Sequence, residues 1–116
     1  MIITDMVKCR AAGIDYDGGL HRFGGKTALY NKYLIKFFDD PTFKTLGEKL
    51  AGKNIKEAFI LAHSLKGMSG NLSLDEFYNE LCGLVELLRE DKIEGADEYY
   101  KRLSDLYERA RDAVLQ

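Results

Sequence analysis

Apolar residues recur every three or four positions along most of this chain, and strict alternation of apolar and polar residues is almost absent. A repeat of that period places apolar side chains on one side of an α-helix, whereas a strand needs a period of two. The pattern therefore predicts an all-α fold. The expected helices cover residues 4–12, 15–23, 26–38, 41–52, 54–72, 73–90 and 93–115. Their short connections favour an antiparallel four-helix bundle with additional short N-terminal helices.

Polar residues with short side chains precede several of these repeats and are suited to cap helices, because they accept hydrogen bonds from free backbone N–H groups. They are Thr4 or Asp5, Asp15, Asp39 or Asp40, and Asn54. Pro41 fits the first turn of a helix, where no backbone N–H is needed. Glycines follow the repeats and are expected to end helices. They are Gly13, Gly24, Gly25 and Gly52.

Ser73 and Glu76 lie three residues apart just before another apolar repeat, which is the sequence form of a capping box. We therefore expect a helix to begin at Ser73. The buried faces of the long helices are expected to contain their recurring apolar residues. These are Leu29, Tyr33, Leu34, Phe37 and Phe38; Leu46 and Leu50; Phe77, Leu81, Leu84, Val85 and Leu88; and Tyr99, Tyr100, Leu103, Leu106, Tyr107, Ala110 and Val114.

The helix expected over residues 54–72 carries an unusual stripe beside its apolar arc. The stripe consists of Ile60, His63, Gly67 and Gly70. The arc consists of Ile55, Ala58, Phe59, Ala62, Leu65, Ser69 and Leu72. Glycine costs a helix interior roughly 1 kcal/mol relative to alanine. Two glycines on the turns that follow a histidine therefore indicate a surface kept clear, on which another macromolecule can reach the imidazole.

The string AHSLKGMSGNL, residues 62–72, resembles the phosphorylation-site motif of histidine phosphotransfer (HPt) domains. The segment GIDYDGGLHRFGGKTALYNKYLIKFF before it and the segment LSLDEFYNELCGLVELLRE after it are also similar to that family, so the resemblance runs from residue 13 to residue 90. Ser73 departs from the pattern, because many members have glycine at that position. We expect serine to alter the helix end without removing a group that the chemistry needs.

The resemblance implies that His63 carries a phosphoryl group, that Lys66 lies beside it and that Gly67 lets a receiver domain approach. The group would pass in line between His63 and receiver aspartates, with Mg²⁺ supplied by the receiver. The ordinary pKa of histidine, about 6.5, provides a neutral nucleophile near pH 7 without a dedicated base. The implied partners are response-regulator receiver domains and a hybrid histidine kinase.

Receiver docking needs an apolar patch near the histidine. Ile60 is the best candidate, because it lies one turn before His63 on the same stripe. Phe23 and Leu20 extend the patch by analogy with the family's use of neighbouring helices. Gly70 and Ser64 complete the expected docking residues, although Ser64 is more readily interpreted as facing solvent.

Composition and charge exclude several classes of partner. The 116 residues fit one domain over 1–116, and 17 basic and 19 acidic residues give a net charge of −2. This balance provides no electrostatic footprint for nucleic acid or for an anionic membrane. No apolar run approaches the roughly 18 residues of a membrane span, and no signal peptide is recognisable. We expect a cytoplasmic protein and, because the site lies on an otherwise polar surface, a monomer.

Other candidate chemistry fails on spacing. FGGKT at residues 23–27 ends like a phosphate-binding P-loop, but Leu20 stands where that motif needs glycine and no strand precedes it. Cys9 and Cys82 lie far apart and are expected to act as small apolar side chains. His21 is interpreted as a surface residue, and two distant histidines do not make a metal site. We expect no cofactor and no bound metal.

The sequence thus predicts a phosphocarrier without a catalytic cycle of its own, which relays phosphoryl groups between receiver aspartates through His63. The alternative is a helical docking module that binds a receiver or a histidine kinase without carrying phosphate. A purely structural adaptor is a third possibility. It predicts that His63→Gln leaves all partner behaviour intact.

Overall fold

The computed structural model describes residues 6–115. Within that range the chain is helical and contains no strand. The helices are α1 (Met6–Ala11), α2 (Tyr16–Arg22), α3 (Thr27–Asp39), α4 (Thr42–Ala51), α5 (Ile55–Asn71), α6 (Asp75–Arg89) and α7 (Ala96–Val114). The predicted all-α class is confirmed.

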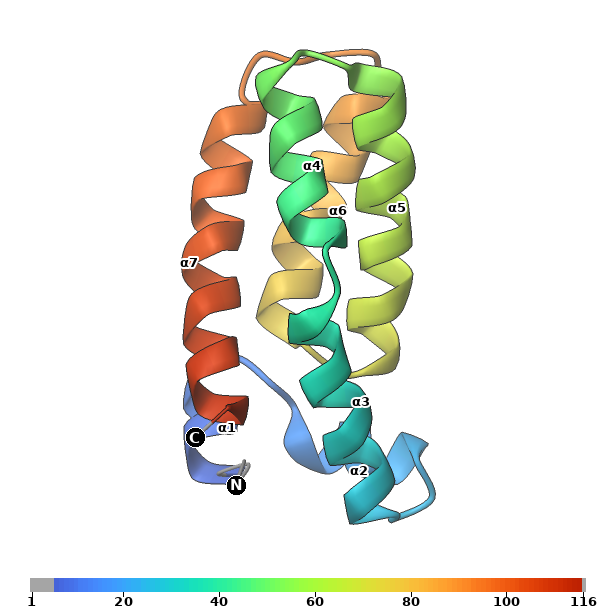
Figure 1. Ribbon diagram of the computed structural model, residues 1–116, viewed down its shortest axis with the longest axis vertical. Helices are drawn as coiled ribbons and strands as arrows, with labels where there is room; N and C mark the ends of the chain where they lie inside the picture. The colour runs from blue at the N-terminus through green and yellow to red at the C-terminus, as the bar shows by residue number, and fades with distance from the viewer. Residues whose placement is uncertain (1–5, 116) are drawn as a thin grey trace.

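The helices form an elongated antiparallel bundle (Figure 1). Helices α3 and α4 follow one another along one side, separated by a turn, and α5, α6 and α7 form the other three sides. Helix α5 packs against α4 and α6, and α6 packs against α7. The short helices α1 and α2 lie at the end of the bundle where α5 finishes. This arrangement confirms the predicted four-helix bundle with additional short N-terminal helices.

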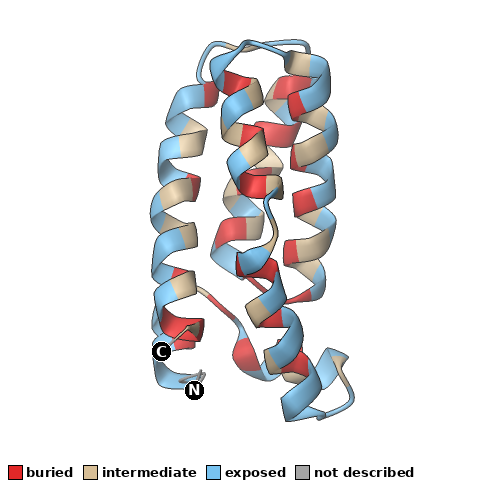
Figure 2. Ribbon diagram, viewed as in Figure 1, coloured by how far each residue is buried: buried red, intermediate tan, exposed pale blue. Residues whose placement is uncertain are grey.

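The core lies along the axis of the bundle, where buried residues face inward from each long helix (Figure 2). All five apolar residues predicted for the buried face of α6 are at most 3% exposed. Aromatic rings pack between α4 and α7. Phe43 of α4 stacks on Tyr100 and Tyr107 of α7, and its ring centroid lies 4.8 and 4.5 Å from theirs. Neither Cys9 nor Cys82 forms a disulfide; Cys9 is fully buried and Cys82 is half-buried.

Most predicted helix ends are close to the observed ones. The Asp15 carboxylate accepts a hydrogen bond from the Gly18 N–H, and the Asn54 side chain accepts one from the Glu57 N–H, so both residues cap helices as predicted. Asp40 accepts from the Thr42 N–H at 2.8 Å. Gly13, Gly24 and Gly25 all have positive φ angles, as their places at helix ends require. Thr4 and Asp5 lie outside the described residues.

The last helix begins later than predicted, at Ala96 in place of residue 93. Gly95 immediately before it has a φ of +90°, which glycine adopts without a steric cost. At the end of α4 the left-handed residue is Lys53, with a φ of +57°, and Gly52 keeps a φ of −81°.

The predicted buried face of α3 is partly wrong. Leu29 and Tyr33 are 37% and 43% exposed, whereas Tyr30 is fully buried. The Tyr30 hydroxyl donates a hydrogen bond of 2.7 Å to the Leu72 carbonyl, and burial raises the pKa of this phenol. The side of α3 that faces the core is therefore the side that carries Tyr30, whose hydroxyl group has a hydrogen-bond partner at the end of α5.

The capping box predicted at Ser73 and Glu76 is also wrong. Ser73 has a left-handed φ of +58° and is buried, and its N–H and that of Leu74 donate to carbonyls in the last turn of α5. The Glu76 N–H donates to the Gly13 carbonyl at 3.2 Å instead of to a serine hydroxyl. Ser73 thus ends α5, at a position where glycine is the usual residue, and does not cap α6.

Candidate functional site

Helix α5 presents two contrasting faces. Ala58, Ala62 and Leu65 face the core, and each is at most 2% exposed. On the stripe predicted to be open, Ile60 is 59% exposed, and His63 and Gly67 are also exposed. The same helical period that buries one face therefore places the imidazole at the surface.

The two glycines of the stripe differ. A side chain added at Gly67 would meet no atom within 4 Å, so this position is open. A Cβ at Gly70 would lie 3.1 Å from the Tyr78 ring, so this glycine makes room for a tyrosine from α6. The prediction of a cleared surface is confirmed at Gly67 and is only partly right at Gly70.

A shallow hollow of about 450 Å³ surrounds the exposed side of His63. Its lining comes from α2, α5 and the beginning of α6. The residues are Arg22, His63, Lys66, Gly67, Gly70, Asn71, Asp75 and Tyr78. The structure thus brings His63, Lys66, Gly67 and Gly70 together as predicted. Arg22, Asp75 and Tyr78 also line the hollow. The sequence did not indicate these three residues, because their proximity to His63 depends on how α2 and α6 pack against α5.

The charges around this hollow are two cations and one carboxylate. Neither Lys66 nor Arg22 has a carboxylate within ion-pair distance among residues 6–115. Burial raises the pKa of Asp75 and nearby Asp15 adds to the effect, while Arg22 opposes it. The hollow therefore holds cationic groups that are available to an incoming anion.

One aromatic side chain, Phe59, lies next to His63. The Phe59 ring lies 5.9 Å from the imidazole, and the Arg89 guanidinium covers Phe59 at 5.2 Å. Ser64 faces solvent, as the sequence favoured, and His21 is exposed as predicted. The imidazole is thus accessible from solvent while a neighbouring ring restricts it on one side.

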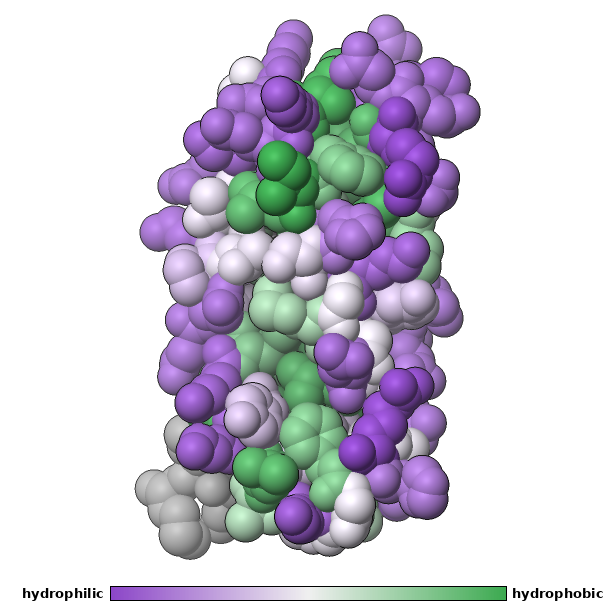
Figure 3. All heavy atoms as spheres, turned by 90° about the vertical axis from the view of Figure 1, so that its right-hand side faces the viewer, coloured by the Kyte–Doolittle hydropathy of each residue, from purple (hydrophilic) through white to green (hydrophobic). Residues whose placement is uncertain are grey.

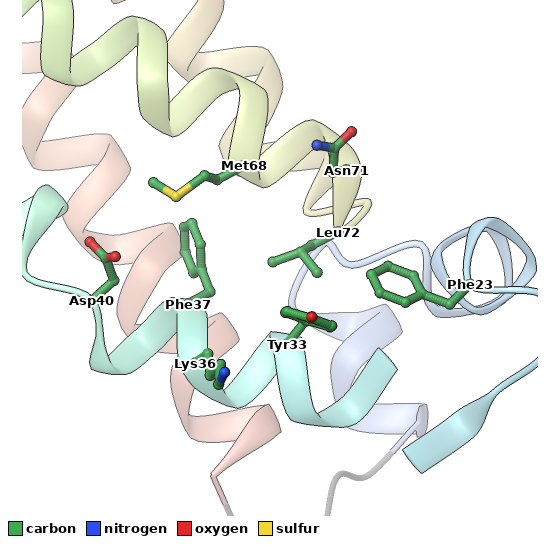
Figure 4. Close-up of a pocket in the computed structure, with 8 residues that line it drawn as sticks. All are labelled: Phe23, Tyr33, Lys36, Phe37, Asp40, Met68, Asn71 and Leu72. Carbon is green, nitrogen blue, oxygen red and sulfur yellow. The ribbon is translucent and has the colours of Figure 1, made fainter. Parts of the chain in front are cut away.

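A second hollow, of about 470 Å³, lies between α3 and the end of α5 (Figure 4). Its apolar side chains are Phe23, Tyr33, Phe37, Met68 and Leu72, with Lys36, Asp40 and Asn71 at its edges. Asn71 also lines the hollow around His63, so the two are adjacent.

The predicted docking residues are distributed over this side of the molecule. Phe23 lines the second hollow, whereas Leu20 is partly buried against the core. Figure 3 faces the α5 side and shows apolar surface along its middle, with hydrophilic residues on both flanks. Ile60 is the most exposed apolar residue on α5.

Residues 6–115 contain neither a membrane-spanning helix nor a cluster of metal ligands. No helix there is long and apolar enough to cross a membrane. No group of three or more His, Cys, Asp or Glu side chains in the same part of the chain is placed to hold a metal ion.

Comparison with known families gives a match to the Hpt domain over residues 40–113. This match includes α4 to α6, nearly all of α7 and therefore the motif around His63; the segment 13–38, which also resembles the family, lies outside it. A comparison with curated proteins found no match, and a comparison with solved structures found none either. Because the match covers more than half of the chain, the protein belongs to the Hpt domain family of phosphocarriers, the phosphotransfer modules of two-component signalling.

Proposed function

We propose that this protein relays phosphoryl groups between receiver-domain aspartates and that His63 is the residue that carries them. The observation that supports this most directly is the exposed imidazole beside Lys66, above an open surface at Gly67. A phosphorelay histidine must be reached by a second protein, and a receiver aspartate lies in a pocket that the imidazole has to enter. A bulky side chain one turn after the histidine would obstruct that approach.

The transfer is a reversible exchange of one bond for another. A nitrogen of the neutral His63 imidazole attacks the phosphorus of a receiver's aspartyl phosphate. The new N–P bond forms as the acyl P–O bond breaks, the aspartate leaves as a carboxylate, and the imidazole loses its remaining N–H proton to water. The reverse sequence delivers the group to another receiver. Positioning and charge neutralisation supply most of the catalysis in such steps.

The residues around His63 have separate roles in this proposal. Lys66, one turn further along α5, neutralises phosphoryl oxygens with its ammonium group. Gly67 provides clearance, and the exposed Ile60 contributes apolar docking area. The Mg²⁺ ion belongs to the receiver's acidic pocket. The partners are receiver domains and a hybrid histidine kinase, and the protein acts as a monomeric single domain without a catalytic cycle of its own.

The test is transfer of radiolabelled phosphate from a panel of phosphorylated receiver domains of the same organism. Wild-type protein, His63→Gln and His21→Gln are compared, and His21 is the matched control because it is the chain's other histidine and is also exposed. Acid-labile, base-stable label should appear on wild type and on His21→Gln and be lost in His63→Gln. Label that persists in His63→Gln would contradict the assignment.

A docking module that never carries phosphate is the second candidate, supported by the apolar surface along the α5 side (Figure 3). The two functions separate in the same experiment. A receiver that binds the folded wild-type protein but transfers no label would favour docking. Binding that is unchanged in His63→Gln would strengthen that conclusion.

A further inference from the structure

Arg22 reaches the hollow around His63 from outside the motif helix. It is the last residue of α2 and lines the same hollow as His63 and Lys66. Its side chain is exposed, and no carboxylate lies within ion-pair distance of it in the described part of the chain. Arg22 also precedes the segment that matches the Hpt family, which begins at residue 40. The family match therefore assigns it no role.

The backbone that carries Arg22 is held against the end of α5. The Asp15 N–H donates to the Ser73 carbonyl at 2.9 Å, and the Glu76 N–H donates to the Gly13 carbonyl at 3.2 Å. The residue after Arg22, Phe23, packs its ring 5.3 Å from the buried Tyr30 ring. These contacts fix α2 at the junction of α5 and α6, so the position of Arg22 beside the site is built into the fold.

The charge balance of the hollow changes when His63 is phosphorylated. Before phosphorylation the hollow contains the cations Lys66 and Arg22 and one carboxylate, Asp75. A phosphoryl group adds close to two negative charges near neutral pH. Lys66 alone would then face both the phosphoryl group and Asp75. A second cation in the same hollow reduces this excess of negative charge.

We propose that Arg22 is a second phosphoryl-binding residue, whose guanidinium binds the oxygens of phosphohistidine 63. This inference rests on the proposed phosphorylation of His63. Guanidinium groups suit this task because their planar N–H donors match phosphate oxygens in pairs, which a lysine ammonium does not do. Because no ion pair joins Arg22 to a carboxylate in the described part of the chain, its guanidinium is available when the phosphoryl group appears.

The experiment titrates the phosphoryl group directly. Wild type, Arg22→Gln, Arg22→Lys and Arg109→Gln are phosphorylated with phosphoramidate, whose P–N bond breaks as ammonia leaves, so no protein partner is involved. The ³¹P resonance is then followed from about pH 6 to about pH 9. Arg109 is the matched control, because it is an exposed arginine on α7, on the opposite side of the bundle from α5 (Figure 1). Circular dichroism confirms that each variant is folded.

A nearby cation favours the dianionic phosphoryl group and lowers its titration midpoint. In Arg22→Gln the midpoint should rise by about half a pH unit relative to wild type, the shift expected for a solvent-exposed charge pair. Arg22→Lys should fall in between, and Arg109→Gln should match wild type. A folded Arg22→Gln that titrates like wild type would overturn the proposal, as would slower transfer from a receiver without any change in the midpoint.

Failure of the underlying function gives a different result. If wild type and Arg22→Gln both show no phosphohistidine signal that depends on His63, the proposed phosphocarrier function fails and the role of Arg22 fails with it. If wild type is labelled on His63 and only the shift is missing, the phosphocarrier function stands and Arg22 has no part in holding the group.

Discussion

Glycines on opposite sides of this bundle serve different purposes. On the α7 side, a Cβ at Gly47 of α4 would lie 2.5 Å from the Tyr100 hydroxyl oxygen, and one at Gly83 of α6 would lie 2.5 Å from the Tyr99 ring. On the outer face of α5, a Cβ at Gly67 would meet nothing within 4 Å. The first two glycines make room for tyrosines of the same molecule, whereas no described part of the chain fills the space beside Gly67.

Glycines in this bundle therefore differ in what offsets their cost to helix stability. Glycine inside a helix is unfavourable by roughly 1 kcal/mol relative to alanine. At Gly47 the packing of Tyr100 offsets that cost, because the tyrosine also stacks on Phe43 and donates to its carbonyl at 3.0 Å. At Gly67 no intramolecular contact offsets it. In the proposed function, the absence of a side chain there keeps His63 accessible to a receiver domain.

The largest expected effect is on folding at the buried position. Gly47→Leu should lower the free energy of unfolding by about 3 kcal/mol, because the side chain would overlap Tyr100 in a packed layer. Urea denaturation measures this. Gly67→Leu is the matched comparison and should stay within about 1 kcal/mol of wild type. Equal destabilisation by the two substitutions would remove the distinction between the regions.

The next effect is on function at the open position. Gly67→Leu should slow phosphoryl transfer from a receiver domain at least about tenfold, equivalent to about 1.4 kcal/mol, because the side chain blocks the approach to His63. Labelling by phosphoramidate should change little, since a small donor needs no docking surface. Lys101→Leu, at an exposed position on α7, is the control for added apolar surface. Transfer from the receiver at the wild-type rate in Gly67→Leu would show that Gly67 is not at the interface.

The hydrogen bond from the Tyr100 hydroxyl group allows a test of the packing between α4 and α7. Tyr100→Phe removes the hydrogen bond to the Phe43 carbonyl and should lower the free energy of unfolding by about 1 kcal/mol near neutral pH. The urea midpoint measures this loss. Its pH dependence gives a second and independent test of the same contact.

Burial raises the pKa of Tyr100 above its ordinary value of 10.0. The unfolded chain therefore deprotonates first, and the stability that depends on the neutral phenol is present below pH 10 and is lost as the pH rises above 10. Tyr100→Phe should lose less stability than wild type over that interval. An equally steep alkaline loss in both proteins would contradict the prediction.

The smallest effect is a gain in stability at the open glycine. Gly67→Ala should raise the free energy of unfolding by roughly 0.5–1 kcal/mol, because alanine favours the helix and meets no neighbour. Gly70→Ala is the matched comparison and should gain less, because its Cβ would lie 3.1 Å from the Tyr78 ring. Thermal unfolding resolves both changes. A loss of stability in Gly67→Ala would show that the position is more crowded than the structure indicates.

Much of the candidate site follows from local sequence alone. The apolar period that buries Ala58, Ala62 and Leu65 also places His63 and Gly67 at the surface, because both sets lie on one regular helix. The buried face of α3 does not follow from its local sequence, because Tyr30 is buried in place of Leu29 and Tyr33. Apolar residues lie on more than one side of that helix, so its orientation depends on which neighbours it meets.

The helix boundaries, the bundle class and the exposed stripe on α5 were thus determined largely by the sequence, because they depend on residues a few positions apart. Tertiary structure decided the rest. The Glu76 N–H pairs with Gly13 and leaves Ser73 to end α5, and Arg22 arrives beside His63 from a separate helix. Such contacts depend on how distant segments pack, and no local period or spacing in the chain encodes them.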